Sequence, residues 1–168
     1  MGTPLMDVVP SSYENVRLQS ELVRELIGDY LKTDGSVRNR LRLSLTRFSR
    51  AMRWRDSGNR ALALAIALEA LLTDGRGEHT FKTALRSGLL TEGAEARARA
   101  RAIVTAVYDV RSAVVHDGTA PPKVRVPGSG KQPTDAVVKE AAAIAARILR
   151  RIVHEGQIPD WQQFDLGG

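Results

Sequence analysis

The most informative absence in this chain of 168 residues is cysteine, of which it has none. That absence excludes disulfide bonds, thiolate nucleophiles and cysteine-rich metal sites. The three histidines, His79, His116 and His154, stand far apart in the sequence, without the spacing of metal ligands. The glycine pairs at 75–77 and 128–130 lack the strand before and the helix after that a phosphate-binding loop requires. We therefore expect neither a metal nor a cofactor.

Long hydrophobic runs are also missing from the sequence. No stretch approaches the ~20 apolar residues that cross a bilayer. Residues 1–10 lack both the basic start and the apolar centre of a signal peptide. We therefore expect a cytoplasmic protein that does not contact a membrane.

Aromatic residues are scarce, at 5% of the chain, while hydrophobic residues make up 43%. The core is therefore expected to consist of Leu, Ala, Val and Ile. These residues recur at spacings of three and four, which predicts helices, and no segment shows the alternation of a strand. The expected helices are 13–32 (capped by Ser11 or Ser12), 37–52, 60–73, 78–87, 91–116 (capped by Thr91) and 135–154 (capped by Thr134).

These elements predict an all-α fold, a compact bundle of five to six helices. The helix at 60–73 is apolar almost all round and should be central. Residues 117–133 are rich in Gly, Pro and Lys and should form an exposed, mobile loop. Ile158, Trp161, Phe164 and Leu166 should pack the tail on the bundle. Residues 1–35 are expected to form a leader and first helix on a single globular unit, 36–168.

Positive charge is concentrated in one segment. Between residues 38 and 60 there are eight arginines and one acidic residue, Asp56, whereas the whole chain has a net charge of +6. A basic segment of this kind indicates a polyanionic partner such as RNA, and a solvated helix face is the alternative interpretation. Within this segment, the candidate contacts are Arg42, Arg50 and Arg53.

Two residues near the end of the longest expected helix suit phosphodiester cleavage without a metal. The guanidinium of Arg111 can hold two phosphate oxygens, and the imidazole of His116 can exchange a proton near neutral pH. Their spacing alone is weak evidence, because roughly one such pair is expected by chance among 20 arginines and three histidines. Arg147 and His154 also fit, and we expect them to be a coincidence in mid-helix, among core residues.

The surroundings of Arg111 are more specific, because they form the pattern Tyr108-x-x-Arg111-Ser112-x-x-x-His116-x-Gly118. Three other segments accompany it in order, namely 65–72 with Glu69, 81–86 and 148–161. Together they resemble the HEPN superfamily, marked by an arginine and a histidine with four to six residues between them, and look most like its Apea-like branch. The resemblance covers about residues 40–165.

The resemblance implies a HEPN-like all-α domain that commonly forms homodimers, here through the helix at 103–116. In active members the two copies build a metal-independent endoribonuclease, often in a toxin, an antiviral defence system or RNA processing. Carried over by position, Arg111 would hold the phosphate and His116 would be the general acid and base. Ser112 would be an auxiliary polar contact, and Glu69 would orient Arg111.

Each of these roles has a structural alternative. Arg111 and Glu69 could simply neutralise each other, since a lone buried carboxylate needs a cation. His116 could cap its helix, and Tyr108, the fourth candidate contact to nucleic acid, could serve packing alone. The alternative function is a non-catalytic HEPN-type module that binds RNA, a nucleotide or an unidentified protein partner. A generic helical DNA-binding protein is disfavoured, because no helix-turn-helix pairing stands out.

Overall fold

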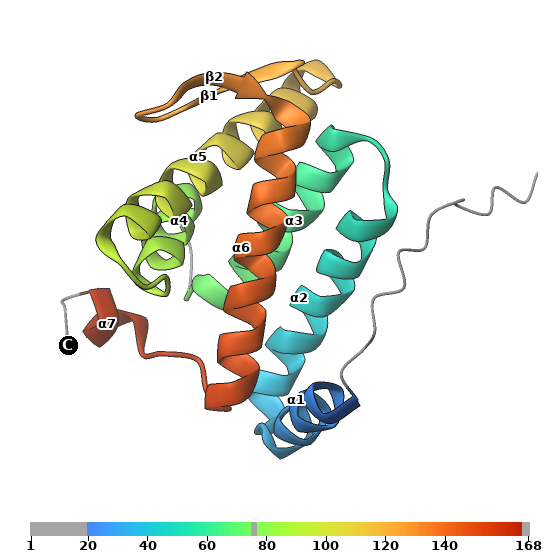
Figure 1. Cartoon of the computed structure of the whole chain (residues 1–168), viewed down its shortest axis with the longest axis vertical. Coiled ribbons are helices and arrows are strands. Elements are labelled where there is room, and N and C mark those ends of the chain that lie inside the picture. The colour runs from blue at the N-terminus through green and yellow to red at the C-terminus, as the bar shows by residue number, and fades with distance from the viewer. Residues whose placement is uncertain (1–19, 75–76, 166–168) are drawn as a thin grey trace, which may run out of the picture.

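The computed structural model describes residues 20–74 and 77–165 (Figure 1). These residues form an all-α bundle, as predicted, with one small hairpin beside it. The elements in chain order are α1 (Ser20–Lys32), α2 (Gly35–Arg53), α3 (Ser57–Leu72), α4 (His79–Leu89), α5 (Ala94–Asp117), β1 (Lys123–Val126), β2 (Gly130–Pro133), α6 (Thr134–Glu155) and α7 (Trp161–Asp165). No helix in the described ranges has both the length and the hydropathy needed to cross a membrane.

Helix α3 is the centre of the bundle, as its sequence predicts. It packs against α2, α4, α5 and α6, and Figure 1 shows α6 crossing in front of it. Leu64, Leu68 and Leu71 are at most 1% exposed. Burying each of these leucine side chains contributes about 1.5–3 kcal/mol. Because α3 is surrounded on several sides, the half-buried Glu69 carboxylate on it lies close to groups on neighbouring helices.

Aspartate side chains cap the starts of α2 and α3, whereas two of the caps that we expected lie elsewhere. The carboxylate of Asp34 accepts hydrogen bonds from the amides of Ser36 and Val37 at the start of α2. Helix α5 begins three residues later than predicted, because Gly93, at a φ of 83°, precedes it in place of Thr91. The Thr91 hydroxyl instead donates to the Ser87 carbonyl, 2.8 Å away, and completes the end of α4.

A second expected cap lies inside its helix. Thr134 is the first residue of α6, and Pro133 occupies the capping position. The Thr134 side chain is buried, and its hydroxyl donates to the carbonyl of Pro121. This bond ties the start of α6 to the segment that leaves α5.

The predicted loop at 117–133 is wrong for its second half, which forms an antiparallel hairpin. Val124 pairs with Gln132, and Val126 pairs with Gly130. Val124 and Val126 are 6% and 0% exposed, so one face of β1 packs on α5 and α6. The alternation Lys-Val-Arg-Val is the strand signal in this segment. The hairpin thus lies along α5, and Arg99 in the second turn of α5 donates to Ser129 and Gln132 of the hairpin.

The C-terminal segment packs on the bundle, as predicted, through Trp161, which is 3% exposed. The guanidinium of Arg86, 1% exposed, lies 4.8 Å from the centre of the Trp161 ring. Arg86 also donates to both carboxylate oxygens of Asp165, to Asp74 and to the Leu72 carbonyl. This buried arginine therefore joins the end of α3 to α4 and α7. Leu166, which we also expected here, lies outside the described residues.

Helix α1 packs on the bundle less deeply than the others. Within Ser20–Lys32 no residue is buried, and Ile27 and Leu31 are more than half exposed. Its contacts are chiefly with the end of α6. The first part of the predicted helix, 13–19, and its caps Ser11 and Ser12 lie outside the described residues.

Candidate functional site

Helix α5 carries four of the eight predicted site residues and is regular to its end. It runs unbroken from Ala94 to Asp117. Gly118 ends it in the left-handed conformation, with a φ of 75°, and its amide donates to the Val114 carbonyl at 3.1 Å. The helix therefore ends one residue beyond the predicted range of 91–116.

The side chain of Glu69 meets that of Tyr108 between α3 and α5. The Tyr108 hydroxyl donates to Glu69 Oε1 at 2.8 Å. Thr83 Oγ1, from α4, lies 3.1 Å from the same phenolic oxygen. Because the single phenolic proton goes to the carboxylate, the Thr83 hydroxyl donates to Tyr108. Burial raises the pKa of Tyr108, with Glu69 adding to the effect, so the phenol stays protonated.

Tyr108 is 4% exposed. The sequence made it a candidate contact to nucleic acid, but in the core its ring cannot reach one. The buried position of Tyr108 agrees with the alternative role, which is packing, and its hydroxyl also forms a hydrogen bond. The hydroxyl supplies a hydrogen bond to the half-buried carboxylate of Glu69 on the otherwise apolar helix α3. Thr83, which is fully buried, was not found by sequence reasoning.

Arg111 lies one turn further along α5, next to the same carboxylate. Its Nη2 atom is 3.9 Å from Glu69 Oε1, an ion pair without a hydrogen bond. Its guanidinium carbon lies 5.6 Å from the centre of the Tyr108 ring. The Nε atom is buried without a hydrogen-bond partner in the described residues, while 37% of the side chain is exposed. One side of the guanidinium thus lies against the core, while part of the side chain is exposed to solvent.

Ser112 and His116 lie on a different side of α5. Both are exposed, and they are one turn apart. Because α5 is regular, Arg111 and His116 are separated by about 140° around the helix and ~7.5 Å along it. One copy of the chain therefore brings Glu69 and Arg111 together but does not bring His116 to them. Val115, which is 61% exposed, lies between Arg111 and His116 on the surface of α5.

The arginine-rich segment divides into structural and free side chains. Arg40 donates to the carbonyls of Ala70, Leu71 and Thr73 at the end of α3, where the helix dipole favours a cation. Arg38 and Arg60 are likewise engaged, with carbonyls and with an aspartate respectively. An eight-arginine track is therefore too large an estimate.

The three arginines that we chose as candidate contacts to nucleic acid remain available on α2. Arg42, Arg50 and Arg53 are all exposed. They lie within an arc of about 80° on this helix, because residues 8 and 11 apart return to nearly the same side. Arg53 donates to Ser49, which holds its side chain along the helix. These residues form what we call the α2 basic stripe.

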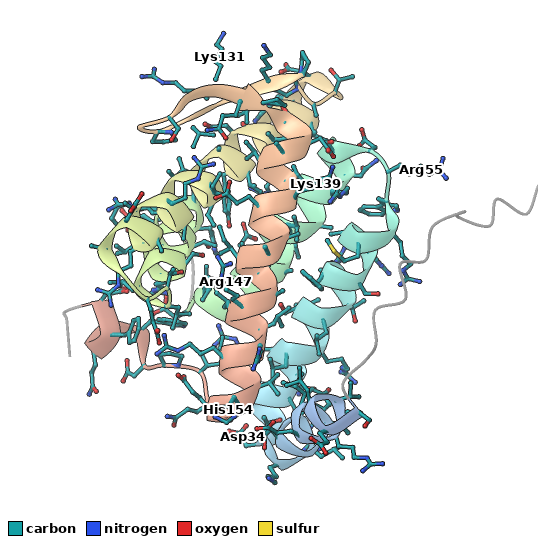
Figure 2. The ribbon with its side chains drawn as sticks, in the orientation of Figure 1. Asp34, Arg55, Lys131, Lys139, Arg147 and His154 are labelled. Carbon is teal, nitrogen blue, oxygen red and sulfur yellow. The ribbon has the colours of Figure 1, made fainter. Side chains whose placement is uncertain are left out.

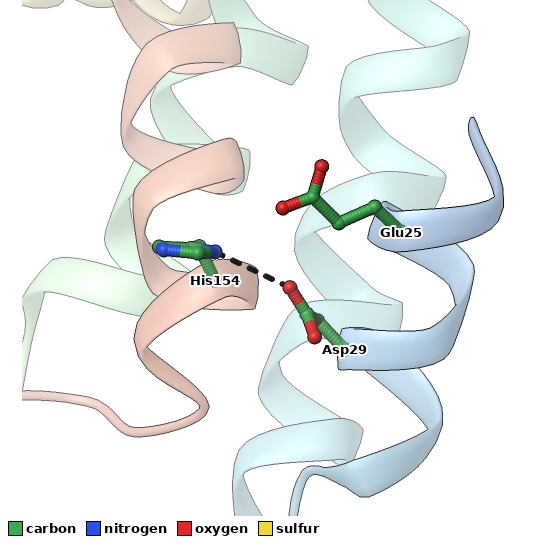
Figure 3. Close-up of side chains that lie close together, drawn as sticks. All are labelled: Glu25, Asp29 and His154. Atoms are coloured by element: carbon green, nitrogen blue, oxygen red, sulfur yellow. Dashed lines mark hydrogen bonds and ion pairs between the residues drawn. The ribbon is translucent and has the colours of Figure 1, made fainter. Parts of the chain in front are cut away.

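A second group of ionisable side chains lies between α1 and α6, where the sequence predicted none. Glu25 and Asp29 of α1 face His154 of α6 (Figure 3). His154 Nδ1 is 3.3 Å from Asp29 Oδ2, and one ligand atom from each of the three residues lies within 4.8 Å of the others. Spacing along the chain could not reveal this group, because Asp29 and His154 are 125 residues apart.

The residues next to Arg147 and His154 in the sequence belong to the core, as expected, but these two side chains themselves point away from it. Both side chains are exposed on α6 (Figure 2), and both line a hollow of about 580 Å³ beside α1. Residues seven apart in a helix lie about 20° apart, so this pair shares one face. The apolar residues around them in the sequence occupy the opposite side of α6.

Comparisons of the chain with models of protein families, with curated proteins and with solved structures gave no match in any of the three. The likeness to HEPN proteins therefore rests on the residues of this chain.

Proposed function

We propose that the chain is a metal-independent endoribonuclease of HEPN type, whose site forms between two copies. The observation that carries the proposal is the setting of Arg111. A cation in the middle of the signature lies next to the Glu69 carboxylate and the Tyr108 ring, while part of its side chain is exposed to solvent. A pre-oriented guanidinium of this kind suits a phosphate, whose charge grows in the transition state of cleavage.

The proposed reaction needs no nucleophile from the protein. An imidazole removes the proton of a ribose 2′-hydroxyl, and the resulting oxygen attacks the adjacent phosphorus. The bond from phosphorus to the 5′-oxygen breaks, and a second imidazole gives that oxygen a proton. The products are a 2′,3′-cyclic phosphate and a 5′-hydroxyl. Arg111 stabilises the negative charge on the phosphate oxygens during the transfer.

Two copies are required because one chain offers a single histidine near Arg111, on another side of the helix. A two-fold axis beside the end of α5 would place His116 of each copy near Arg111 of the other. The exposed face that carries Ser112, Val115 and His116 supports this arrangement. The homodimer and RNA are the partners of this proposal, and its setting is a toxin, defence or RNA-processing system.

The test is cleavage of single-stranded RNA in excess chelator by wild type, His116→Ala and His79→Gln. We expect wild type and the His79 variant to leave 2′,3′-cyclic phosphate ends. The His116 variant should be slower by roughly 10²- to 10⁴-fold, the usual contribution of a general acid or base. Equal rates for wild type and His116→Ala, or cleavage that stops with chelator, would reject the proposal.

The second candidate is a non-catalytic module that binds RNA, and two observations favour it. Helix α5 keeps Arg111 and His116 apart within one chain, and the α2 basic stripe is exposed on a separate helix. This candidate predicts no turnover but salt-sensitive retention of RNA. Replacing Arg42, Arg50 and Arg53 by Gln should lower the slope of log affinity against log salt by about 2 for a single strand.

The matched control for that variant removes the same charge elsewhere. Arg24, Arg125 and Lys131 are exposed on α1 and the hairpin. If their joint replacement by Gln weakens RNA binding as much as the α2 change does, the stripe has no special part in binding. A salt-independent interaction would exclude phosphate contacts altogether.

A further inference from the structure

Apolar burial fixes helix α1 to the bundle only in part, through the half-buried Leu26 and Tyr30. No residue of Ser20–Lys32 is buried, so apolar burial contributes less here than for the other long helices. Glu25 and Asp29, one turn apart on α1, nevertheless point at the last turns of α6 (Figure 3). They meet His154 there, in a hollow of about 580 Å³.

We propose that Glu25, Asp29 and His154 bind a divalent transition-metal ion of the zinc class, and that this ion fastens α1 to α6. The site is separate from the proposed ribonuclease site, which lies on α3 and α5. It adds a metal that serves structure to a protein whose proposed chemistry needs none.

The distances suit an ion after small movements of side chains. Zinc binds imidazole nitrogen and carboxylate oxygen at about 2.0–2.2 Å, so ligand atoms in a tetrahedral site lie about 3.4 Å apart. His154 Nδ1 and Asp29 Oδ2 are already 3.3 Å apart. The largest separation in the group is within 4.8 Å. Rotation of the exposed Glu25 side chain closes that difference without moving either helix.

The ligand types decide which ion fits. Imidazole suits zinc, copper, iron and nickel, whereas magnesium and calcium prefer oxygen ligands alone. Two carboxylates balance the charge of a divalent ion. Three protein ligands leave room for water from the hollow in the fourth position. We therefore expect zinc to bind and magnesium to bind much more weakly.

Nearby arginines set a limit on the affinity. Arg147, Arg150 and Arg151 line the same hollow, as do Glu92 and Glu155. Arg151 is paired with Glu155 at 2.7 Å, so its charge is largely compensated. The two other arginines repel a cation, and their removal should tighten zinc binding. The same substitutions would weaken the binding of an anion, so they distinguish a cation site from an anion site.

The experiment uses the full chain, freed of metal and titrated with zinc or magnesium at pH 7 by calorimetry. We expect one zinc ion per chain for wild type. His154→Ala and Asp29→Asn should each bind at least tenfold more weakly, while Glu21→Gln, an exposed carboxylate of α1 outside the group, should bind as wild type does. Equal zinc binding by the His154 and Asp29 variants, or none by wild type, would overturn the site.

Hydrogen exchange tests the fastening of α1. Zinc should slow exchange of the amides in Ser20–Lys32 in wild type but leave them unchanged in His154→Ala, while exchange in α3 stays the same in both. Unchanged exchange in α1 of zinc-loaded wild type would overturn the fastening role. Chelator should release α1 without stopping RNA cleavage, so loss of this site and loss of the ribonuclease activity are distinguishable.

Discussion

Replacing Tyr108 by Phe removes one oxygen atom from the contact between α3 and α5. The lost interaction is the 2.8 Å hydrogen bond to the Glu69 carboxylate, together with the 3.1 Å contact to Thr83. A hydrogen bond to a charged group contributes about 1.5–3 kcal/mol. The Glu69 side chain is 21% exposed, so water can replace part of the loss. We therefore expect the free energy of unfolding to fall by about 2 kcal/mol.

Urea unfolding at pH 7 measures this change, and a melting curve should show a midpoint lower by roughly 4–8 °C for a chain of this size. Tyr30→Phe is the matched control, because the hydroxyl of this half-buried tyrosine makes no hydrogen bond within the described residues. It should change the free energy by less than about 0.5 kcal/mol. Tyr108→Phe combined with Glu69→Gln should cost less than the sum of the single changes, because both variants weaken the same bond.

The same variant tests the site. If Glu69 and Tyr108 hold Arg111 for phosphate, Tyr108→Phe should reduce RNA cleavage or binding at temperatures where the variant is fully folded. A loss of stability below about 0.5 kcal/mol would refute the strong hydrogen bond. If the free energy of unfolding falls as expected but RNA activity is unchanged, the hydrogen bond is supported and its role in positioning Arg111 is refuted.

Three further changes address the fold. Because the pKa of Tyr108 is raised, the folded state keeps a phenolic proton that the unfolded state loses near pH 10. The free energy of unfolding of wild type should therefore fall, relative to that of Tyr108→Phe, by about 1.4 kcal/mol per pH unit above pH 10. A constant difference between the two proteins from pH 8 to 11 would contradict this. Arg86→Met leaves two carboxylates without their buried cation and should cost about 3–5 kcal/mol in urea unfolding, with Arg86→Lys milder; a cost below about 1 kcal/mol would contradict the geometry. Gly58→Ala should destabilise by about 1 kcal/mol despite the better helix propensity, because the added Cβ would lie 2.7 Å from a methyl group of Val114; a gain in melting temperature would show that α5 yields.

Helix periodicity was sufficient to find the bundle. The pattern at 37–52 corresponds to α2 (Gly35–Arg53), and the apolar run at 60–73 corresponds to the central helix α3. The hairpin escaped prediction because its strands have four residues each and its composition is that of a loop. Its burial comes from packing on α5 and α6, which local sequence does not contain.

For the candidate site, the sequence indicated that Glu69 requires a partner but did not identify all of its partners. A carboxylate on an apolar helix predicts a cationic partner, and Arg111 lies beside Glu69 as expected. The stronger contact, from Tyr108, depends on how α3 and α5 are rotated against each other. The group around His154 depends on two helices from opposite ends of the chain. Such contacts are fixed by tertiary packing, which periodicity in one helix cannot specify.

The Arg86 cluster has a consequence for the order of folding. Asp165 follows Arg86 by 79 residues, so a growing chain makes the guanidinium long before this partner. At about 5–20 residues per second, the interval during synthesis is roughly 4–16 s. Until then, an arginine destined for 1% exposure has Asp74 as its available carboxylate. The packing of α7 around Arg86 must therefore be a late step of folding, and α7 forms part of the core.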